Sequence, residues 1–412
     1  MIAEEQPPSS FESQGRKEFW AEASREEWED FRWQIRNSIR TVAKLGRLLR
    51  LSEEEKREIR QVAGNFRFSI TPYYFTLMNP LDASDPIRRQ AVPSAEETKF
   101  GSMGEADPLG ELGDLVTAGL IHRYPDRVLL VATNVCATYC RHCTRKRIWK
   151  SAEAHLTEEQ FQQIIAYLES HREIREVVIS GGDPLVLPMW QLEGMLRRLR
   201  AIPHVEILRI GTRVPVVLPM RVDDELCRVI ERYRPIWLNT QFNHPREITP
   251  EAAMACERIL KAGVPVNNQS VLLAGVNDRP EVMIELCQGL LKIGARPYYL
   301  FQCDPVVGAE HLRTSVWTGI DIVERMRGHI SGLAIPTFVV DAPEGGGKIP
   351  LQPNYLLSMS DEEIVLRNYE GRIIRYRNPR SQPTSALSVM TPDEASGHFE
   401  HAGVKPDSLH RA

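Results

Sequence analysis

The sequence has no excess of basic residues and no long apolar run. Its 412 residues include 51 lysines and arginines against 55 aspartates and glutamates, so the formal net charge is −4. This balance gives no support to nucleic-acid binding. No apolar run reaches the roughly 18 residues that cross a bilayer, and residues 1–16 are polar rather than signal-like. We therefore expect a cytoplasmic protein with no membrane or nucleic-acid partner.

Cysteine is also scarce, and its spacing matters more than its number. Seven cysteines in a cytosolic chain do not indicate a disulfide framework. Cys136, Cys140 and Cys143 form a C-x3-C-x2-C loop, and three thiolates can hold a [4Fe–4S] cluster while leaving its fourth iron open to a small chelating molecule. Zinc would need a fourth ligand, and His142 lies between two of the cysteines, where it could hardly reach the same ion. The spacing therefore favours the cluster.

After residue 127, short apolar runs alternate with amphipathic stretches at intervals of about thirty residues. Runs that are apolar throughout indicate parallel strands with helices outside them. The expected strands are 128–133, 177–180, 205–211, 236–240, 264–271, 297–301 and 335–340, and the expected helices are 157–170, 189–200, 223–233, 250–262, 279–292 and 318–329. This order predicts an α/β protein with a full or partial β/α barrel. Its chemistry would lie at the C-terminal ends of the strands.

The two flanking regions have other patterns. Up to about residue 65, aromatic and apolar residues recur at helical spacing among charges, which we interpret as core packing. Residues 71–126 are rich in proline and predict a loop-rich connection with short helices. The polar residues 379–412 predict a flexible tail.

One lysine stands out near the end of the last apolar run. Lys348 follows three glycines, and a phosphate-binding P-loop is excluded because Ile349 stands where serine or threonine would be needed. A mobile glycine arm with a single lysine suits a Schiff base, in which the amine attacks an aldehyde. A solvated surface loop is the alternative.

Together these motifs resemble the lysine 2,3-aminomutase family of radical S-adenosylmethionine (radical SAM) enzymes. The likeness runs from about Trp20 to Tyr376 and includes the segments His122–Arg127, Phe242–Pro245 and Asn268–Ser270. It implies a partial (β/α)6-type radical SAM barrel with an N-terminal helical extension and a C-terminal pyridoxal phosphate-binding arm. The expected domains are an extension at 1–115, a barrel at 116–345, a segment carrying the pyridoxal phosphate lysine at 346–378 and a tail at 379–412.

The resemblance also implies three cofactors and their binding residues. They are a [4Fe–4S] cluster on the three cysteines, S-adenosylmethionine and pyridoxal phosphate. Lys348 matches the family lysine that binds pyridoxal phosphate as an aldimine. Further cofactor-binding residues implied by the resemblance are Arg123, Tyr124, Arg127, His142 and Gln269, with Gly181, Gly182 and Asp183 as the motif that receives the methionyl amine.

The implied reaction moves the α-amino group of L-lysine to the β-carbon and gives β-lysine, through a pyridoxal phosphate aldimine and a 5′-deoxyadenosyl radical. Arg145 matches the arginine that pairs with the substrate carboxylate, and Asp304 and Asp341 match the carboxylates that hold the distal ammonium. Two carboxylates in a closed site favour a dibasic substrate. The alternatives are the same migration on arginine or glutamate, and a cluster- or zinc-stabilised binding protein without catalysis.

Departures from the family pattern carry their own expectations. No cysteine follows Cys303, and Arg279 stands where some members have a zinc ligand, so we expect no structural zinc. Gln241 replaces a common histidine, and Pro305 follows Asp304 where lysine-specific members carry leucine, which weakens the lysine assignment. The resemblance further implies a homo-oligomer and a one-electron reductant such as flavodoxin or ferredoxin.

Overall fold

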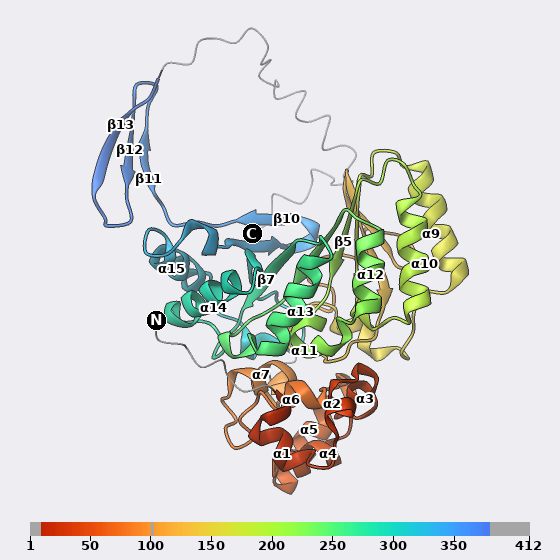
Figure 1. Cartoon of the computed structure of the whole chain (residues 1–412). Helices are drawn as coiled ribbons and strands as arrows, with labels where there is room; N and C mark the ends of the chain where they lie inside the picture. Colours follow the sequence, from red (N-terminus) through yellow and green to blue (C-terminus); the bar gives the residue numbers. More distant parts are fainter. Residues whose placement is uncertain (1–9, 100–102, 380–412) are drawn as a thin grey trace. The chain divides into compact units, whose positions relative to one another are not determined.

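The computed structural model describes residues 10–99 and 103–379 (Figure 1). The chain divides into two compact units, Met1–Pro353 and Asn354–Ala412. The expected flexible tail therefore lies almost wholly outside the described residues, and the division into four domains stays a prediction. Within the described part of the chain, no helix is long and apolar enough to cross a membrane.

The first unit is built on a ten-stranded sheet whose strands follow one another in sequence order, β1 to β10. All neighbouring pairs from β3 to β9 are parallel, and the outer pairs β1–β2, β2–β3 and β9–β10 are antiparallel. The strands are β1 Leu115–Thr117, β2 Leu120–Tyr124, β3 Arg127–Thr133, β4 Glu176–Gly181, β5 Ile207–Gly211, β6 Ile236–Thr240, β7 Val266–Leu272, β8 Arg296–Gln302, β9 Thr337–Ala342 and β10 Gly347–Pro350.

A long helix joins each parallel strand to the next. These helices are α9 Glu158–Ser170, α10 Met189–Arg200, α12 Asp224–Arg232, α13 Pro250–Lys261, α14 Pro280–Lys292 and α15 Val316–Met326, with the short α11 Val214–Val217 before α12. Figure 1 shows α9, α10, α12 and α13 lying along the outside of the strands. The expected α/β architecture, with its seven strands and six helices, is confirmed within one or two residues at most ends.

Residues at the N-terminal ends of these helices favour the start of a helix. Thr157 accepts a hydrogen bond from the backbone N–H of Gln160, whose side chain bonds back, which forms a capping box at α9. Proline in the first turn starts α13 and α14, where its missing N–H costs no hydrogen bond. The chain therefore enters each helix through local chemistry that the sequence already contains.

The N-terminal region is helical, as expected, and its helices are short apart from α5. They are α1 Gln14–Phe19, α2 Arg25–Glu29, α3 Phe31–Arg36, α4 Val42–Leu48, α5 Glu53–Asn65, α6 Pro72–Phe75, α7 Pro86–Ala91 and α8 Glu96–Lys99. Trp28 and Ile39 of the apolar stripe are buried in the main core, which confirms its interpretation as packing. Short 3-10 turns lie at Ser10–Glu12, Lys146–Lys150, Pro184–Val186, Pro219–Arg221, Pro245–Glu247, Glu310–Leu312, Gly332–Ala334 and Pro343–Gly345.

The interpretation of residues 71–126 as loop and short helices is wrong for its last part. Leu115–Thr117 and Leu120–Tyr124 form β1 and β2, which add two antiparallel strands beside β3. β1 has only three residues, and only the first two residues of β2 are apolar, so neither strand has the longer apolar run that marks the parallel strands. Gly119 between them has a φ of 81°, which suits a tight turn in the left-handed region. This hairpin is what carries Arg123 and Tyr124 to the sheet.

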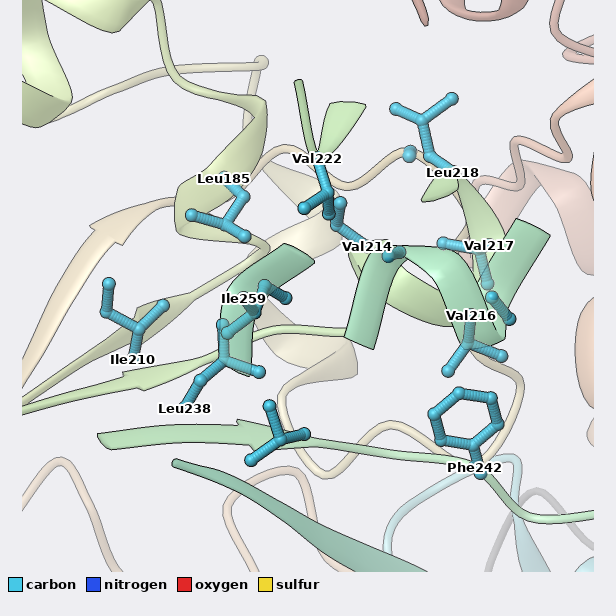
Figure 2. Packing of buried hydrophobic residues seen from close by; sticks show 14 of the residues in the cluster. Leu185, Ile210, Val214, Val216, Val217, Leu218, Val222, Leu238, Phe242 and Ile259 are labelled. Carbon is cyan, nitrogen blue, oxygen red and sulfur yellow. The ribbon is translucent and has the colours of Figure 1, made fainter. Parts of the chain in front are cut away.

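The core continues beyond the C-terminal ends of β5 and β6. Figure 2 shows Ile210 of β5 and Leu238 of β6 near Ile259 of α13. It also shows Val214 of α11 near Val222, and Val216 of α11 near Phe242. Each of these side chains is at most 2% exposed. Such burial stabilises a side chain by about 1.5–3 kcal/mol. The strand ends are thus anchored directly below the loops that carry the predicted site.

The second unit contains a small antiparallel sheet. Its strands are β11 Leu356–Met359, β12 Glu363–Arg367 and β13 Ile373–Arg377, in that order. The turn between β12 and β13 is organised by Asn368, whose side chain accepts hydrogen bonds from the backbone N–H groups of Glu370 and Arg372. Every residue of these strands is at least partly exposed within the described structure.

Gly319 in α15 tests the packing of the last helix against the sheet. A Cβ added there would overlap the ring of Phe338 in β9, which is fully buried. We expect Gly319→Ala to destabilise the protein by about 1–3 kcal/mol, because the overpacked ring must shift. Urea unfolding measures this change. Gly194→Ala is the matched control, because a Cβ in the middle of α10 meets no atom within 4 Å; it should stabilise by up to about 1 kcal/mol. Equal stability of both variants would contradict the packing account.

Candidate active site

Residues of strands β2 to β9, and of loops that follow several of them, line a cavity of about 760 Å³. This volume is within the usual range for ligand sites. Strands, the cysteine loop and the β9–β10 hairpin all contribute to its wall. The structure brings every residue of the predicted site to this one cavity, although their individual roles stay predictions. They are Arg123, Tyr124, Arg127, Cys136, Cys140, His142, Cys143, Arg145, Gly181, Gly182, Asp183, Gln269, Asp304, Asp341 and Lys348.

The cysteine loop follows β3 and is held from outside the barrel. The backbone N–H of Tyr139 donates to the carbonyl of Ser69 at 3.2 Å, and that of Arg141 donates to the carbonyl of Gln90 at 2.8 Å. The Arg141 guanidinium also donates to the carbonyl of Arg67 at 3.0 Å. The N-terminal segment therefore fixes the loop that carries the three cysteines.

A buried ion cluster strengthens this contact. Arg141 donates to Glu97 through Nε at 2.8 Å and Nη2 at 2.7 Å, and Lys146 Nζ lies 3.0 Å from the same carboxylate. All three side chains are at most 1% exposed. Burial alone would raise the pKa of Glu97, but the two cations outweigh it and the pKa lies below its ordinary value. Glu97 is thus an anion at neutral pH, bonded to residues on both sides of Cys143.

The donor set of the loop suits a cluster better than a single ion. Among the described residues, no three cysteine, histidine or acidic side chains converge tightly enough to hold one metal ion. Each thiolate of a [4Fe–4S] cluster binds a different iron, so three cysteines around one cavity wall fit that group without converging on a point. Burial, followed by the neighbouring Cys140, raises the pKa of Cys143 to about 11. Iron would therefore bind with release of thiol protons.

The glycine motif after β4 has a structural reason visible here. A Cβ on Gly181 would overlap the backbone of Thr133, and one on Gly182 would overlap that of Val135. Only glycine lets the end of β4 approach the start of the cysteine loop this closely. Asp183 accepts hydrogen bonds from the N–H of Leu185 at 3.0 Å, the hydroxyl of Thr212 at 2.7 Å and the N–H of Arg213 at 2.7 Å. Its carboxylate thus orders the loops at this strand end.

His142 faces the cavity in its neutral form. Burial, followed by repulsion from Arg213, lowers the pKa of His142 to about 3. Its Nε2 lies 3.4 Å from the Gln241 amide oxygen, and its Nδ1 is buried with no hydrogen-bond partner in the structure. Such an orphaned polar atom in a cavity wall marks a place for a polar ligand group. His142 therefore fits a cofactor contact, as the sequence predicts.

Arg145 is fixed by a partner that the sequence reasoning missed. Its Nε lies 3.0 Å from both oxygens of Glu111, and its Nη2 lies 2.6 Å from Oε1. Arg147 donates to the second oxygen at 2.5 Å. Burial would raise the pKa of Glu111, but Arg145 and Arg147 lower it to about 2. Glu111 lies in a proline-rich segment without a motif, so no local signal could have found it.

The arginines expected to bind a phosphate lie beside the glycine segment. Arg123 Nε donates to Asp114 at 2.7 Å, and the Arg127 guanidinium lies 4.0 Å from the centre of the Tyr124 ring. A Cβ on Gly345 would come within 3.4 Å of Arg123, and one on Gly347 within 3.2 Å of the Tyr124 hydroxyl. The β2 hairpin and the glycine segment therefore pack against each other at the cavity wall.

Lys348 does not lie on an open arm, contrary to the sequence interpretation. Gly347–Pro350 forms β10, paired with β9 so that Lys348 stands opposite Asp341. Lys348 Nζ donates to Asp341 Oδ1 at 2.8 Å. The turn uses φ values of 55° at Glu344 and 80° at Gly345 and Gly347, which explains the glycines as turn residues.

Asp304 shares this end of the cavity. Burial raises the pKa of Asp304 to about 7, and repulsion from Asp341 adds to the effect while Lys348 and Arg313 oppose it. Two carboxylates that interact in this way favour a bound cation.

Comparison with known proteins assigns the chain to a family. A family model described as lysine-2,3-aminomutase matches residues 323–410, and one described as the radical SAM superfamily matches residues 130–287. L-lysine 2,3-aminomutase of Clostridium subterminale is 49% identical over 364 residues, which cover 88% of each chain. The same enzyme of Acetoanaerobium sticklandii is 48% identical over 361 residues, 88% of this chain and 87% of that one. The chain belongs to the lysine 2,3-aminomutase family.

The family includes more than one named substrate. Glutamate 2,3-aminomutase of Clostridioides difficile is 43% identical over 370 residues, 90% of this chain and 87% of that one. Among solved structures, a radical SAM methyltransferase from Sphaerobacter thermophilus matches with a TM-score of 0.40 and 22% identity over 54% of this chain and 68% of that one.

The protein is an isomerase, a radical SAM aminomutase acting on a small molecule, and its superfamily implies a [4Fe–4S] cluster and S-adenosylmethionine.

Glu97 tests how far the cysteine loop depends on buried charge. Glu97→Gln leaves the buried cations Arg141 and Lys146 underpaired, so we expect a loss of about 3–5 kcal/mol in the free energy of unfolding. Because the pKa of Glu97 is lowered in the folded state, its contribution is present at neutral pH and disappears as the pH falls through that pKa. Chemical unfolding at pH 7 and at acid pH measures both effects. Glu53→Gln, which removes an exposed partner of Lys56, is the control and should not change stability. A wild-type unfolding curve for Glu97→Gln would refute the account.

Proposed function

We propose that the protein moves the α-amino group of L-lysine to the β-carbon and gives β-lysine, with pyridoxal phosphate bound at Lys348. The observation that carries this proposal is the pairing of Lys348 Nζ with Asp341 Oδ1 at 2.8 Å in the cavity that the cysteine loop also lines. An amine for the cofactor and a carboxylate for a substrate ammonium thus share one site. The proposed location is the cytoplasm, with a homo-oligomeric assembly.

Cofactor binding in this proposal divides between two sides of the cavity. Arg123, Tyr124 and Arg127 hold the phosphate, since guanidinium groups match its charge and shape. Cys136, Cys140 and Cys143 hold the cluster. When bound, pyridoxal phosphate links to an amine and spreads an unpaired electron beside it, while the reduced cluster and S-adenosylmethionine supply the initiating radical. A one-electron donor such as flavodoxin or ferredoxin would reduce the cluster.

Arg145 binds the substrate carboxylate in this scheme, and Glu111 positions Arg145. A guanidinium has five N–H donors, and the contacts with Glu111 involve only Nε and Nη2. The proposal assigns Nη1 to the substrate. Because Glu111 is buried and itself held by Arg147, it keeps the guanidinium plane fixed before substrate arrives. Fixed geometry reduces the entropy lost on binding.

Asp304 and Asp341 bind the distal ammonium of the substrate. Asp304 is destabilised as an anion by burial and by Asp341, so a second cation beside them restores the balance. A glutamate side chain would instead bring a third carboxylate to this end of the cavity. The acidic pair therefore supports lysine over glutamate.

Product identification tests the proposal directly. The reconstituted protein is incubated anaerobically with dithionite, S-adenosylmethionine and pyridoxal phosphate, with lysine, arginine and glutamate in separate reactions. We expect β-lysine as the main product, and no product from Lys348→Ala. Borohydride reduction should convert the imine between pyridoxal phosphate and Lys348 into a stable secondary amine in the wild type. Faster turnover of glutamate or arginine than of lysine would overturn the substrate assignment, and attachment to another lysine would overturn the role of Lys348.

Asp304 should make lysine use depend on pH. Because the pKa of Asp304 is raised to about 7, the carboxylate is mostly neutral at pH 6 and mostly ionised at pH 8. Only the ionised form pairs with ammonium, and loss of the Lys348 charge on cofactor binding would raise the pKa of Asp304 further, so kcat/KM for lysine should rise at least about tenfold from pH 6 to pH 8. Asp304→Asn should lose this rise. Its kcat/KM for lysine should also be lower than that of the wild type, by a factor that corresponds to about 2–5 kcal/mol. A variant with the wild-type pH profile would show that Asp304 is not the titrating group.

A further inference from the structure

Arg213 is a buried cation beside the cysteine loop that no motif identified. It follows β5 by two residues and is 7% exposed. Its Nη1 donates a hydrogen bond to Cys140 Sγ at 2.9 Å. This is the one side-chain hydrogen bond from a cation to the sulfur of these three cysteines among the described residues. An arginine aimed at a ligand sulfur needs an explanation beyond packing.

Several partners hold the guanidinium in this orientation. Nε donates to the carbonyl of Gln241 at 3.1 Å. Nη2 donates to Gln90 Oε1 at 2.5 Å, to Glu247 Oε1 at 2.7 Å and to the Tyr74 hydroxyl at 3.0 Å. Only Nη1 remains directed at the sulfur, and the guanidinium plane is fixed by both other nitrogens.

The positive charge of Arg213 is paired with one buried carboxylate, that of Glu247. Glu247 is fully buried and is the carboxylate paired with Arg213. Glu247 also accepts from the Tyr74 hydroxyl at 2.6 Å and from the N–H groups of Asn243 at 2.6 Å and His244 at 3.0 Å. With its anion so heavily hydrogen-bonded, Arg213 retains positive potential toward Cys140. In a low-dielectric interior that potential acts strongly over one hydrogen bond.

We propose that Arg213 is a positioning residue that donates a hydrogen bond to the Cys140 sulfur and raises the reduction potential of the cluster. The proposal rests on the assignment of the cluster to Cys136, Cys140 and Cys143. Reduction adds one electron to the cluster, and a cation with a hydrogen bond to a ligand sulfur stabilises the more negative state. Arg213 thereby makes the cluster easier to reduce by a cellular one-electron donor.

A purely structural role would leave the potential unchanged. Arg213 also joins Tyr74 and Gln90 of the N-terminal segment to Glu247 of the barrel, so its loss could weaken the fold alone. Arg221 provides a matched control. It is also a buried arginine, 2% exposed, that donates to the carbonyl of Leu185 at 2.9 Å and lies 3.6 Å from Asp223. No contact of Arg221 reaches the cysteines in the described structure.

The test measures the midpoint potential of the reconstituted full-length protein by redox titration with electron paramagnetic resonance detection. Iron and sulfide contents are measured in parallel. We expect Arg213→Met to lower the potential by about 59 mV or more, which is a tenfold change in the one-electron equilibrium. Arg213→Lys keeps the charge without the planar fork and should lower it less. Arg221→Met and Arg221→Lys should match the wild type.

The outcomes separate this inference from the proposed function. A full cluster with wild-type potential in Arg213→Met would overturn it, as would an equal fall in Arg221→Met. If Arg213→Met holds no cluster, the midpoint potential of Arg213→Lys becomes the test: a lowered potential supports the inference and a wild-type potential overturns it. A cluster missing from both variants overturns the inference in favour of a folding role. The potential can be measured whichever amino acid is the substrate. Failure to convert lysine would therefore leave this result standing.

Discussion

Buried charge around the cysteine loop is the constraint on which the site depends. Glu97 joins Arg141 and Lys146, and Glu247 joins Arg213, with every carboxylate in these contacts fully buried. Buried pairs are retained at a cost in desolvation, so they contribute less to net stability than to a unique arrangement, as we interpret them here. Without one partner of such a pair, the cysteine loop could adopt other conformations. The N-terminal segment is therefore part of the site's framework.

The parallel strands and their helices could be predicted because each is encoded locally. In β3, residues 128–132 are all apolar, and α9 carries its own capping box. Cys136, Cys140, Cys143 and Lys348 could be named as candidates for the same reason, since their motifs lie in contiguous sequence. The cavity joins residues from the C-terminal ends of the parallel strands, where barrel chemistry is expected, with residues from the antiparallel strands β2 and β10.

The features that escaped prediction depend on distant partners. Glu111 and Arg145 are 34 residues apart, and Glu97 and Arg141 are 44 residues apart, so no local pattern connects either pair. Lys348 was expected on an open arm because three glycines suggest mobility, whereas they serve a turn that pairs β9 with β10. Arg213 was detectable in principle, because it follows the end of a parallel strand. Its residue type alone, without Cys140 beside it, gave no chemistry.

The Lys348–Asp341 pair connects cofactor binding with substrate choice. In this structure, Asp341 has the Lys348 ammonium as its cation. In the proposed function, Lys348 ceases to be a free ammonium when it binds pyridoxal phosphate, and Asp341 and Asp304 then face each other with less compensation. A buried acidic pair in that condition favours any ligand that brings a cation to it. A lysine substrate supplies that cation through its distal ammonium, whereas glutamate would add a further anion. Binding of the cofactor would thus leave negative charge on Asp304 and Asp341 uncompensated, and this charge favours a dibasic amino acid as substrate.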